Sequence, residues 1–224
     1  ARKRQESRLP YQIMDQIKAI EETMVAWRHD LHMHPEIGFE EHRTSDMVAR
    51  TLAGLGYEVH RNIGKTGVVG RLAVGDSRRT IGLRADMDAL PIEEVNQFSY
   101  RSTVKGRMHA CGHDGHVASL LGAARYLSET RRFNGVLNLI FQPAEEGVGG
   151  ARAMLADGLF ERFPCEAVFG FHNEPMLPVG KFAIRPGAML AGGAFFDIVV
   201  KGKGSHAGHP EHSVDPVLTA CHIV

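Results

Sequence analysis

Hydrophobic residues near the amino end of the chain recur at alternating steps of four and three. They are Ile13, Ile17, Ile20, Met24, Trp27 and Leu31. This spacing places them on one face of a helix, and proline after His34 ends it, so we expect a single amphipathic helix there. A second helix is expected over residues 45–55, with Thr44 as its N-cap and Gly56 as the residue that ends it.

Short apolar and β-branched runs then alternate with helical patterns. We expect strands at 57–60, 67–72, 80–85, 136–141 and 167–171, and helices at 116–127 and 151–156. The run 136–141 is almost wholly apolar, as expected of a central strand covered on both faces. The alternation predicts an α/β fold with a mixed, largely parallel sheet and helices on both faces.

The pattern changes after His172, where proline and glycine become frequent. Strands are expected at 181–184 and 195–201, and a helix is expected to start near Asp215. We interpret residues 1–186 as one domain and residues 187–224 as the beginning of a smaller α/β domain. These 38 residues are too few to bury a core of their own, because small domains bury little surface, and domains below about 40 residues are seldom stable.

Composition narrows the classes of function. The 224 residues carry 26 basic and 26 acidic side chains, a balance that provides no basic face for nucleic acid. No apolar run follows the polar amino end, so we expect neither a secretory signal nor a membrane span. Three scattered cysteines suit the cytoplasm. The unusual number is 13 histidines, because imidazole is the commonest metal ligand and a proton carrier near neutral pH.

Chemically active residues follow the expected strands. Asp86 and Asp88 come after 80–85, Glu145 and Glu146 after 136–141, and His172 after 167–171. In an open α/β sheet, ligands bind beyond the carboxyl ends of the strands. The sequence therefore predicts one site to which these residues contribute.

A segment rich in cysteine and histidine, MHACGHDGH at 108–116, lies between the first two groups. Its glycines permit a tight loop from which Cys111 and His113 approach neighbouring ions. A helix amino terminus at this point is expected to favour the thiolate of Cys111 over the thiol. A lone cysteine or histidine is more often a buried or solvated structural residue, but this cluster together with the carboxylates favours a metal site.

The two acidic pairs, Asp86 with Asp88 and Glu145 with Glu146, allow more than one assignment of roles. Neighbouring side chains of an extended chain point to opposite sides, so Glu145 and Glu146 are expected to supply one metal ligand and one base. Asp86 and Asp88 are candidates either to touch a metal or to accept the N–H of a metal-bound histidine. On its own, a Glu-Glu pair is typical of a solvated acidic turn. A lone histidine after an apolar strand, such as His172, is more often a core residue whose hydrogen bonds are satisfied.

Four motifs together resemble the M20 metallopeptidase family. They are RADMDALP at 84–91, MHACGHDGH at 108–116, FQPAEEG at 141–147 and GKGSHA at 202–207. The resemblance is greatest to the amidohydrolase branch, which includes hippurate hydrolases, N-acyl-amino-acid amidohydrolases and auxin-conjugate hydrolases. It implies a zinc-peptidase-like catalytic domain, a small lid or dimerisation domain, and metal-dependent hydrolysis of the amide bond of N-acyl amino acids.

The resemblance also implies roles for individual residues. Two divalent ions, zinc or manganese, would be bound by Cys111, His113, Glu146 and His172, with Cys111 between the ions. Glu145 would be the general base, Asp86 and Asp88 would support the ligands, and Asn173 and His206 would bind substrate. His206 looks like the lid histidine that reaches the active site of a partner subunit, so a homodimer or higher homo-oligomer is expected. Without the resemblance, His206 is an exposed loop residue beside His209 and His212.

One departure from the family pattern is large. The family continues beyond the lid and supplies a last metal-ligating histidine from that part, so we expect the 224-residue piece alone to hydrolyse poorly. Two other interpretations remain. One is a cysteine-dependent amidase with Cys111 as nucleophile, and the other is a metal-binding protein without turnover.

Overall fold

The computed structural model describes residues 9–193 and 196–224, and the chain forms two compact units, Ala1–Phe182 and Ala183–Val224. Our interpretation of these parts as a catalytic domain and the beginning of a lid stays a prediction. The elements of the first unit are α2 (Leu9–Lys18), α3 (Glu21–Met33), α4 (His42–Gly54), β1 (Glu58–Ile63), β2 (Gly67–Val74), β3 (Thr80–Asp86), α5 (His113–Thr130), β4 (Gly135–Gln142), α6 (Gly150–Ala156), α7 (Leu159–Arg162) and β5 (Ala167–Gly170).

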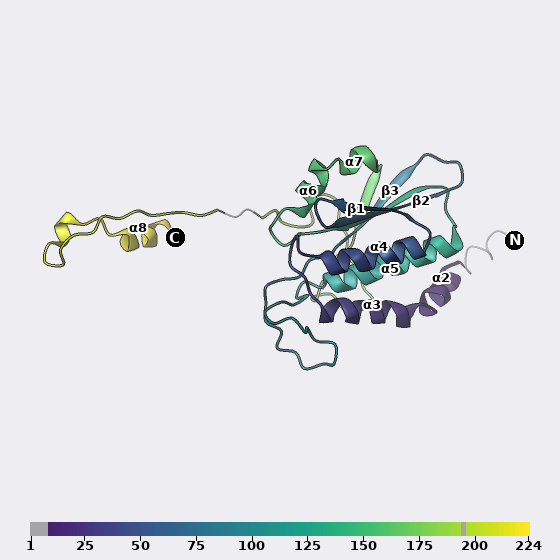
Figure 1. Cartoon of the computed structure of the whole chain (residues 1–224), viewed down its shortest axis with the longest axis horizontal. Helices are drawn as coiled ribbons and strands as arrows, with labels where there is room; N and C mark the ends of the chain where they lie inside the picture. The colour runs from purple at the N-terminus through teal and green to yellow at the C-terminus, as the bar shows by residue number, and fades with distance from the viewer. Residues whose placement is uncertain (1–8, 194–195) are drawn as a thin grey trace. The chain divides into compact units, whose positions relative to one another are not determined.

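The five strands form one mixed sheet in the order β1-β2-β4-β3-β5 (Figure 1). β3 pairs in parallel with β4 and with β5, while β2 pairs antiparallel with β1 and with β4. The expected α/β fold and the central place of the most apolar strand, β4, are confirmed. Seven of its eight residues are buried, because helices cover both of its faces.

Alternation along the strands separates two apolar layers. Val68 and Leu139 face the layer under α3, α4 and α5, whereas their neighbours Val69 and Ile140 face α6 and α7. Figure 1 shows the two groups of helices on opposite sides of the sheet. Since successive side chains of a strand point to opposite faces, the geometry of the strand places neighbouring apolar residues in different layers.

Phe141, near the end of β4, is expected to be among the largest single contributions to the core. Its side chain is 0% exposed, and truncating such a phenylalanine to alanine typically costs about 3–5 kcal/mol of unfolding free energy. We expect Phe141→Ala to lower stability by this amount in urea unfolding. Phe169→Ala on β5 is the matched control, because Phe169 is 57% exposed. Equal losses for the two variants would contradict the assignment of the core.

The first expected helix is two helices, α2 and α3, so the single helix was wrong. Ile20 stands at the break with φ −111° and ψ 2° and is buried. The end at His34 is confirmed, since α3 ends at Met33. Of the helices in the described part of the chain, none combines the length and the apolar character needed to cross a membrane.

Thr44 is not the N-cap that we expected for α4. The helix begins two residues before it, at His42, and Thr44 is buried within the first turn. The carboxylate of Glu36 accepts the backbone N–H groups of Arg43 at 2.9 Å and Thr44 at 2.8 Å. A side chain from the preceding loop therefore satisfies the free N–H groups, so no cap residue is needed at position 44. Gly56, with φ +80°, follows the helix as expected.

The second unit contains the short 3-10 helix η1 (Pro210–His212) and α8 (Pro216–Ile223). The expected start of α8 is confirmed, since the Asp215 side chain accepts the N–H of Val217 at 2.8 Å. The strands expected at 181–184 and 195–201 were wrong over the residues described there, and residue 195 lies outside them. A strand needs a neighbour for its backbone groups, and within the described part of this unit the only bridge joins Lys203 to Val214.

Candidate metal centre

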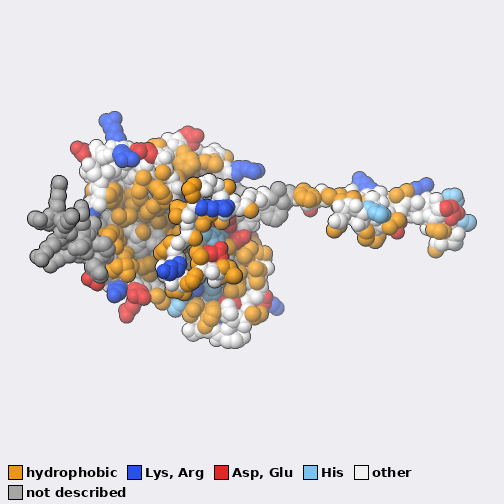
Figure 2. Space-filling view, turned by 180° about the vertical axis from the view of Figure 1, so that it is seen from behind, with side chains coloured by type: hydrophobic (Ala, Val, Ile, Leu, Met, Phe, Trp, Pro, Cys, Tyr) orange, Lys and Arg blue, Asp and Glu red, His pale blue; other side chains and the backbone are white. Residues whose placement is uncertain are grey.

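Parallel strands bring the chemically active segments of the first unit to one edge of the sheet. At the carboxyl ends of β3 and β4, Asp86 pairs with Gln142, and β5 runs parallel to β3. Glu145 follows β4, His172 follows β5, and α5 begins with His113, whose Nε2 lies 3.5 Å from Asp86 Oδ2. In the space-filling view, acidic and histidine side chains lie together on the face of the first unit (Figure 2).

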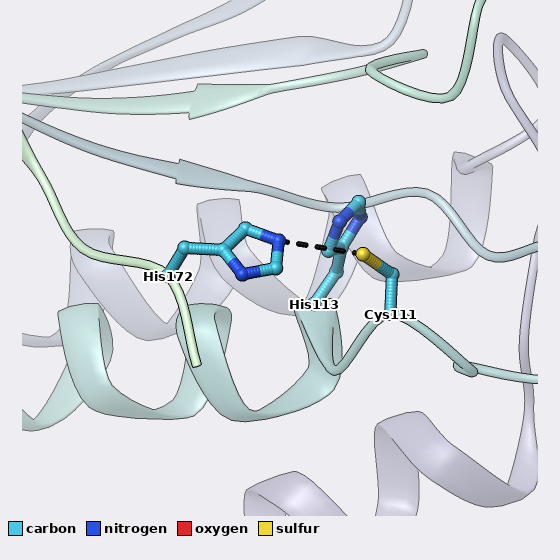
Figure 3. Close-up of side chains that lie close together, drawn as sticks. All are labelled: Cys111, His113 and His172. Carbon is cyan, nitrogen blue, oxygen red and sulfur yellow. Dashed lines mark hydrogen bonds between the residues drawn. The ribbon is translucent and has the colours of Figure 1, made fainter. Parts of the chain in front are cut away.

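Cys111, His113 and His172 form one group of candidate ligands (Figure 3). The Cys111 Sγ lies 3.3 Å from Nε2 of His172, and one donor atom from each of the three residues lies within 4.8 Å of the others. Gly112 makes the turn between the first two ligands at φ +83°. The positive φ favours glycine here, and a side chain at this position would in addition displace the side chain of Asn173.

A second group consists of His113, Glu145 and Glu146. Nε2 of His113 lies 3.8 Å from Glu146 Oε1 and 3.9 Å from Glu145 Oε2. The two groups share His113, so donors from the loop before α5, from the turn after β4 and from the segment after β5 surround one small volume. Sulfur, imidazole nitrogen and carboxylate oxygen are the donors that zinc binds.

His116 belongs to a third group, with Asp86 and His113, but its ring nitrogens are already used. Nδ1 lies 2.6 Å from Asp86 Oδ1, and Nε2 accepts the backbone N–H of Asn173 at 3.1 Å. His116 therefore ties the segment that carries His172 to the end of β3. No separate role for His116 was predicted from the sequence. Its place three residues after His113, on the same face of one helix, was the available signal.

Asp88 contacts two of the candidate ligands, Glu146 through its backbone and His113 through its ring. Its Oδ2 accepts the N–H of Glu146 at 2.9 Å, and its Oδ1 lies 3.3 Å from Nδ1 of His113. That second pair is close enough for an ion pair but is not aligned as a hydrogen bond. Arg84 in turn donates to Asp86 at 2.7 Å. Both aspartates thus contact histidines of the site, as residues that orient metal ligands do.

The acidic surroundings shift the pKa values of the site. Burial, followed by the carboxylates of Glu146 and Glu145, raises the pKa of Cys111 to about 12. Burial and then Glu146 also raise the pKa of Glu145. Burial would lower the pKa of His113, but Asp88 and Asp86 outweigh it and the pKa is raised. Burial is the largest cause for Cys111 and Glu145, but neighbouring carboxylates contribute to all three shifts, and a cation would neutralise their negative charge.

The expectation that the helix amino terminus favours the thiolate of Cys111 was therefore wrong for the protein alone. Burial of the thiol and two nearby carboxylates outweigh the helix dipole, which contributes at most about 2 kcal/mol. A divalent ion bound by Cys111 would reverse this balance, because a thiol that coordinates a metal loses its proton.

Three buried atoms indicate that the residues fit a metal. Nδ1 and Nε2 of His113 and Oε1 of Glu146 have no hydrogen-bond partner among the described residues. Buried polar groups are otherwise almost always paired. A divalent cation would satisfy a ring nitrogen of His113 and the Glu146 oxygen together, and the thiol and second imidazole complete a donor set suited to zinc.

His206 lies in the second unit, where it is exposed and its Nδ1 accepts the backbone N–H of Gly208 at 3.0 Å. The exposed group His209, Glu211 and His212 lies in the same unit, close enough in geometry to meet one ion. Its side chains are 59–71% exposed, so water competes for every donor. The role of His206 toward substrate stays a prediction.

Comparisons with known proteins agree with the resemblance seen in the motifs. Residues 82–222 match peptidase family M20/M25/M40. The hippurate hydrolase of Campylobacter jejuni is 52% identical over 197 residues, which are 88% of this chain and 51% of that protein. The N-acetylcysteine deacetylase of Bacillus subtilis is 42% identical over 209 residues, 92% of this chain and 54% of that protein. The chain thus spans about half the length of these relatives.

Solved structures agree with these sequence comparisons. A putative aminohydrolase from methicillin-resistant Staphylococcus aureus superposes with a TM-score of 0.80 at 34% identity, over 95% of this chain and 56% of that one. A Bacillus subtilis protein described as a dinuclear metal-binding peptidase of the M20 family gives a TM-score of 0.69 at 42% identity, over 73% of this chain and 45% of that one. The chain therefore belongs to peptidase family M20/M25/M40, in the amidohydrolase branch of its hippurate hydrolase and N-acetylcysteine deacetylase relatives.

Proposed function

We propose that the protein is a metal-dependent amidohydrolase that splits N-acyl amino acids, of the hippurate or N-acetyl type, into a carboxylic acid and a free amino acid. The observation that carries this proposal is the buried imidazole of His113, which lies between two carboxylates and the Cys111–His172 pair and whose ring nitrogens have no hydrogen-bond partner among the described residues. Hippurate and N-acetylcysteine are the substrates in the names of two relatives.

Cys111, His113, Glu146 and His172 are the proposed ligands of two divalent ions, zinc or manganese. The ions would lower the pKa of a water and polarise the acyl carbonyl. A Bacillus subtilis relative is described as dinuclear, which supports the number of ions. Asp88 holds the backbone of Glu146 and lies beside the ring of His113, so it orients two ligands at once.

Glu145 is the proposed general base. It removes a proton from the attacking water as the oxygen forms its bond to the acyl carbon, and it returns that proton to the amino nitrogen as the C–N bond breaks. The raised pKa of Glu145, due to burial and then Glu146, brings this carboxyl closer to the operating pH. We propose that Asn173 and His206 bind the substrate, with His206 polarising its carbonyl in a homodimer or higher homo-oligomer, and that the protein acts in the cytoplasm.

The cysteine-dependent amidase is the less favoured candidate. A nucleophilic cysteine needs a pKa lowered toward neutrality by nearby positive charge, whereas burial and two carboxylates raise the pKa of Cys111 to about 12. The acidic side chains around the thiol suit a cation better than a free thiolate.

Removal of metal separates the two candidates. We expect EDTA followed by dialysis to abolish hydrolysis of N-benzoyl and N-acetyl amino acids by the whole protein, and zinc or manganese to restore it. Metal analysis before treatment should give two ions per chain. A panel that also includes indole-acetyl amino acids identifies the preferred acyl group. Full activity after complete metal removal would refute the proposal and support a thiol nucleophile.

A further inference from the structure

Glu41 is wholly buried although the proposed reaction gives it no role. The residue precedes α4 and is 0% exposed. Burial raises the pKa of its carboxyl group, against the hydrogen bonds that it accepts. Because a buried carboxyl group is costly unless it is well paired, its partners indicate what it does in the molecule.

The two oxygens of Glu41 join three distant segments. Oε1 accepts the backbone N–H of Ala144 at 2.7 Å, in the turn after β4. Oε2 accepts the hydroxyl group of Thr66 at 2.5 Å, in the turn between β1 and β2. Thr66 and Ala144 are both buried, so water does not compete for either bond.

Ala144 is the residue immediately before Glu145, and its backbone is strained. Its φ of 48° lies in the left-handed region, which a residue with a Cβ occupies only where its surroundings impose it. Its carbonyl oxygen accepts the N–H of Gly150 at 2.9 Å, while its own N–H is held by Glu41. Both backbone groups of Ala144 are therefore engaged: the bond from Gly150 closes the short loop that carries Glu145 and Glu146, and the bond to Glu41 fixes the start of that loop.

We propose that Glu41 is a positioning residue for this loop: it holds Ala144 in its strained conformation and so sets where the carboxylates of Glu145 and Glu146 point. The inference rests on the proposed function of those two glutamates. Glu41 acts only through Ala144. A displacement of about 1 Å at a reacting group costs up to about 100-fold in rate, so loss of this one hydrogen bond is expected to be visible in catalysis.

The experiment compares three substitutions in the whole, metal-loaded protein. Glu41→Ala leaves the Ala144 N–H without its acceptor, and we expect kcat to fall about 10–100-fold while KM changes less than about 2-fold. Glu41→Gln keeps an oxygen for Ala144 and is expected to retain kcat within about 3-fold, because an amide oxygen accepts the same bond. Thr66→Val removes the other bond of Glu41 and controls for general loss of stability.

Hydrogen exchange at the Ala144 amide provides a measurement that does not need activity. We expect faster exchange in Glu41→Ala than in Glu41→Gln or Thr66→Val. The inference is overturned if kcat is unchanged in Glu41→Ala, if Thr66→Val lowers kcat as much, or if Ala144 exchange is the same in all variants. If the wild-type protein hydrolyses no N-acyl amino acid, the proposed function fails. In that case, faster exchange of the Ala144 amide in Glu41→Ala than in the other two variants still supports the proposal that Glu41 positions the loop. Equal exchange in all variants overturns that proposal.

Discussion

Replacing Glu145 by glutamine is expected to lower kcat for hydrolysis of N-acyl amino acids about 100-fold to 10,000-fold, the usual contribution of a general acid or base. The amide keeps the shape of the side chain but takes up no proton. Glu145 Oε2 lies 3.9 Å from His113 Nε2 and the side chain is 40% exposed, so this carboxylate is accessible to water beside the proposed metal ligand His113. Metal content should stay the same, because the proposed ligand of the pair is Glu146.

Glu129→Gln is the matched control for this experiment, since Glu129 is an exposed carboxylate on α5 that pairs with Arg125. It should leave kcat unchanged. Unaltered hydrolysis by Glu145→Gln would remove Glu145 from the mechanism. Loss of metal together with activity would make Glu145 a ligand. If the wild-type protein binds metal but hydrolyses none of the panel, the interpretation as a metal-binding protein without turnover gains support.

His113→Ala is expected to have the largest effect on metal binding. His113 is the one residue shared by the group with Cys111 and His172 and the group with the two glutamates. Loss of a residue that only orients a ligand typically costs about 10–100-fold in metal affinity, so loss of this ligand should cost more than about 100-fold. Hydrolysis at moderate metal concentration should fall to background. Metal analysis after dialysis, together with a metal titration of activity, measures both effects.

His42→Ala is the control for the histidine substitution, since His42 is exposed at the start of α4. It should retain two ions and full activity. His113 is fully buried, so a circular dichroism spectrum must show that the variant is folded. A folded His113→Ala protein that still holds two ions would place the metals elsewhere and would refute the proposed centre.

Much of the fold follows from local pattern. The apolar run of β4, the short apolar run of β2 and the helical pattern of α5 each predict an element that the structure contains. The order of elements predicts parallel strands, and parallel strands predict that residues at their carboxyl ends share one edge. Asp86, Glu145 and His172 are far apart in sequence. They lie at the same edge because each is at the end of, or just after, one of three parallel strands.

The errors share a physical cause. Thr44 has the chemistry of an N-cap, but Glu36 of the preceding loop takes over the task. The segment 181–184 has the composition of a strand, but it has no partner among the described residues. Cys111 stands before a helix, but burial and then carboxylates from other segments raise its pKa. In each case the local structure or the pKa depends on residues outside the segment concerned. The pattern of residues within that segment contains no information about such contacts.

The sequence by itself therefore determined most of the elements of the first unit, their alternation and the types of donor available, because these depend on residues within a few positions of one another. Only the tertiary structure decided which donors meet. Glu41 and Ala144 are 103 residues apart in sequence, yet they share a 2.7 Å hydrogen bond, and both ring nitrogens of His116 are engaged by segments 30 and 57 residues away. Hydrogen bonds and charges act over a few ångströms in space, so contacts of this kind exist only once the chain has folded.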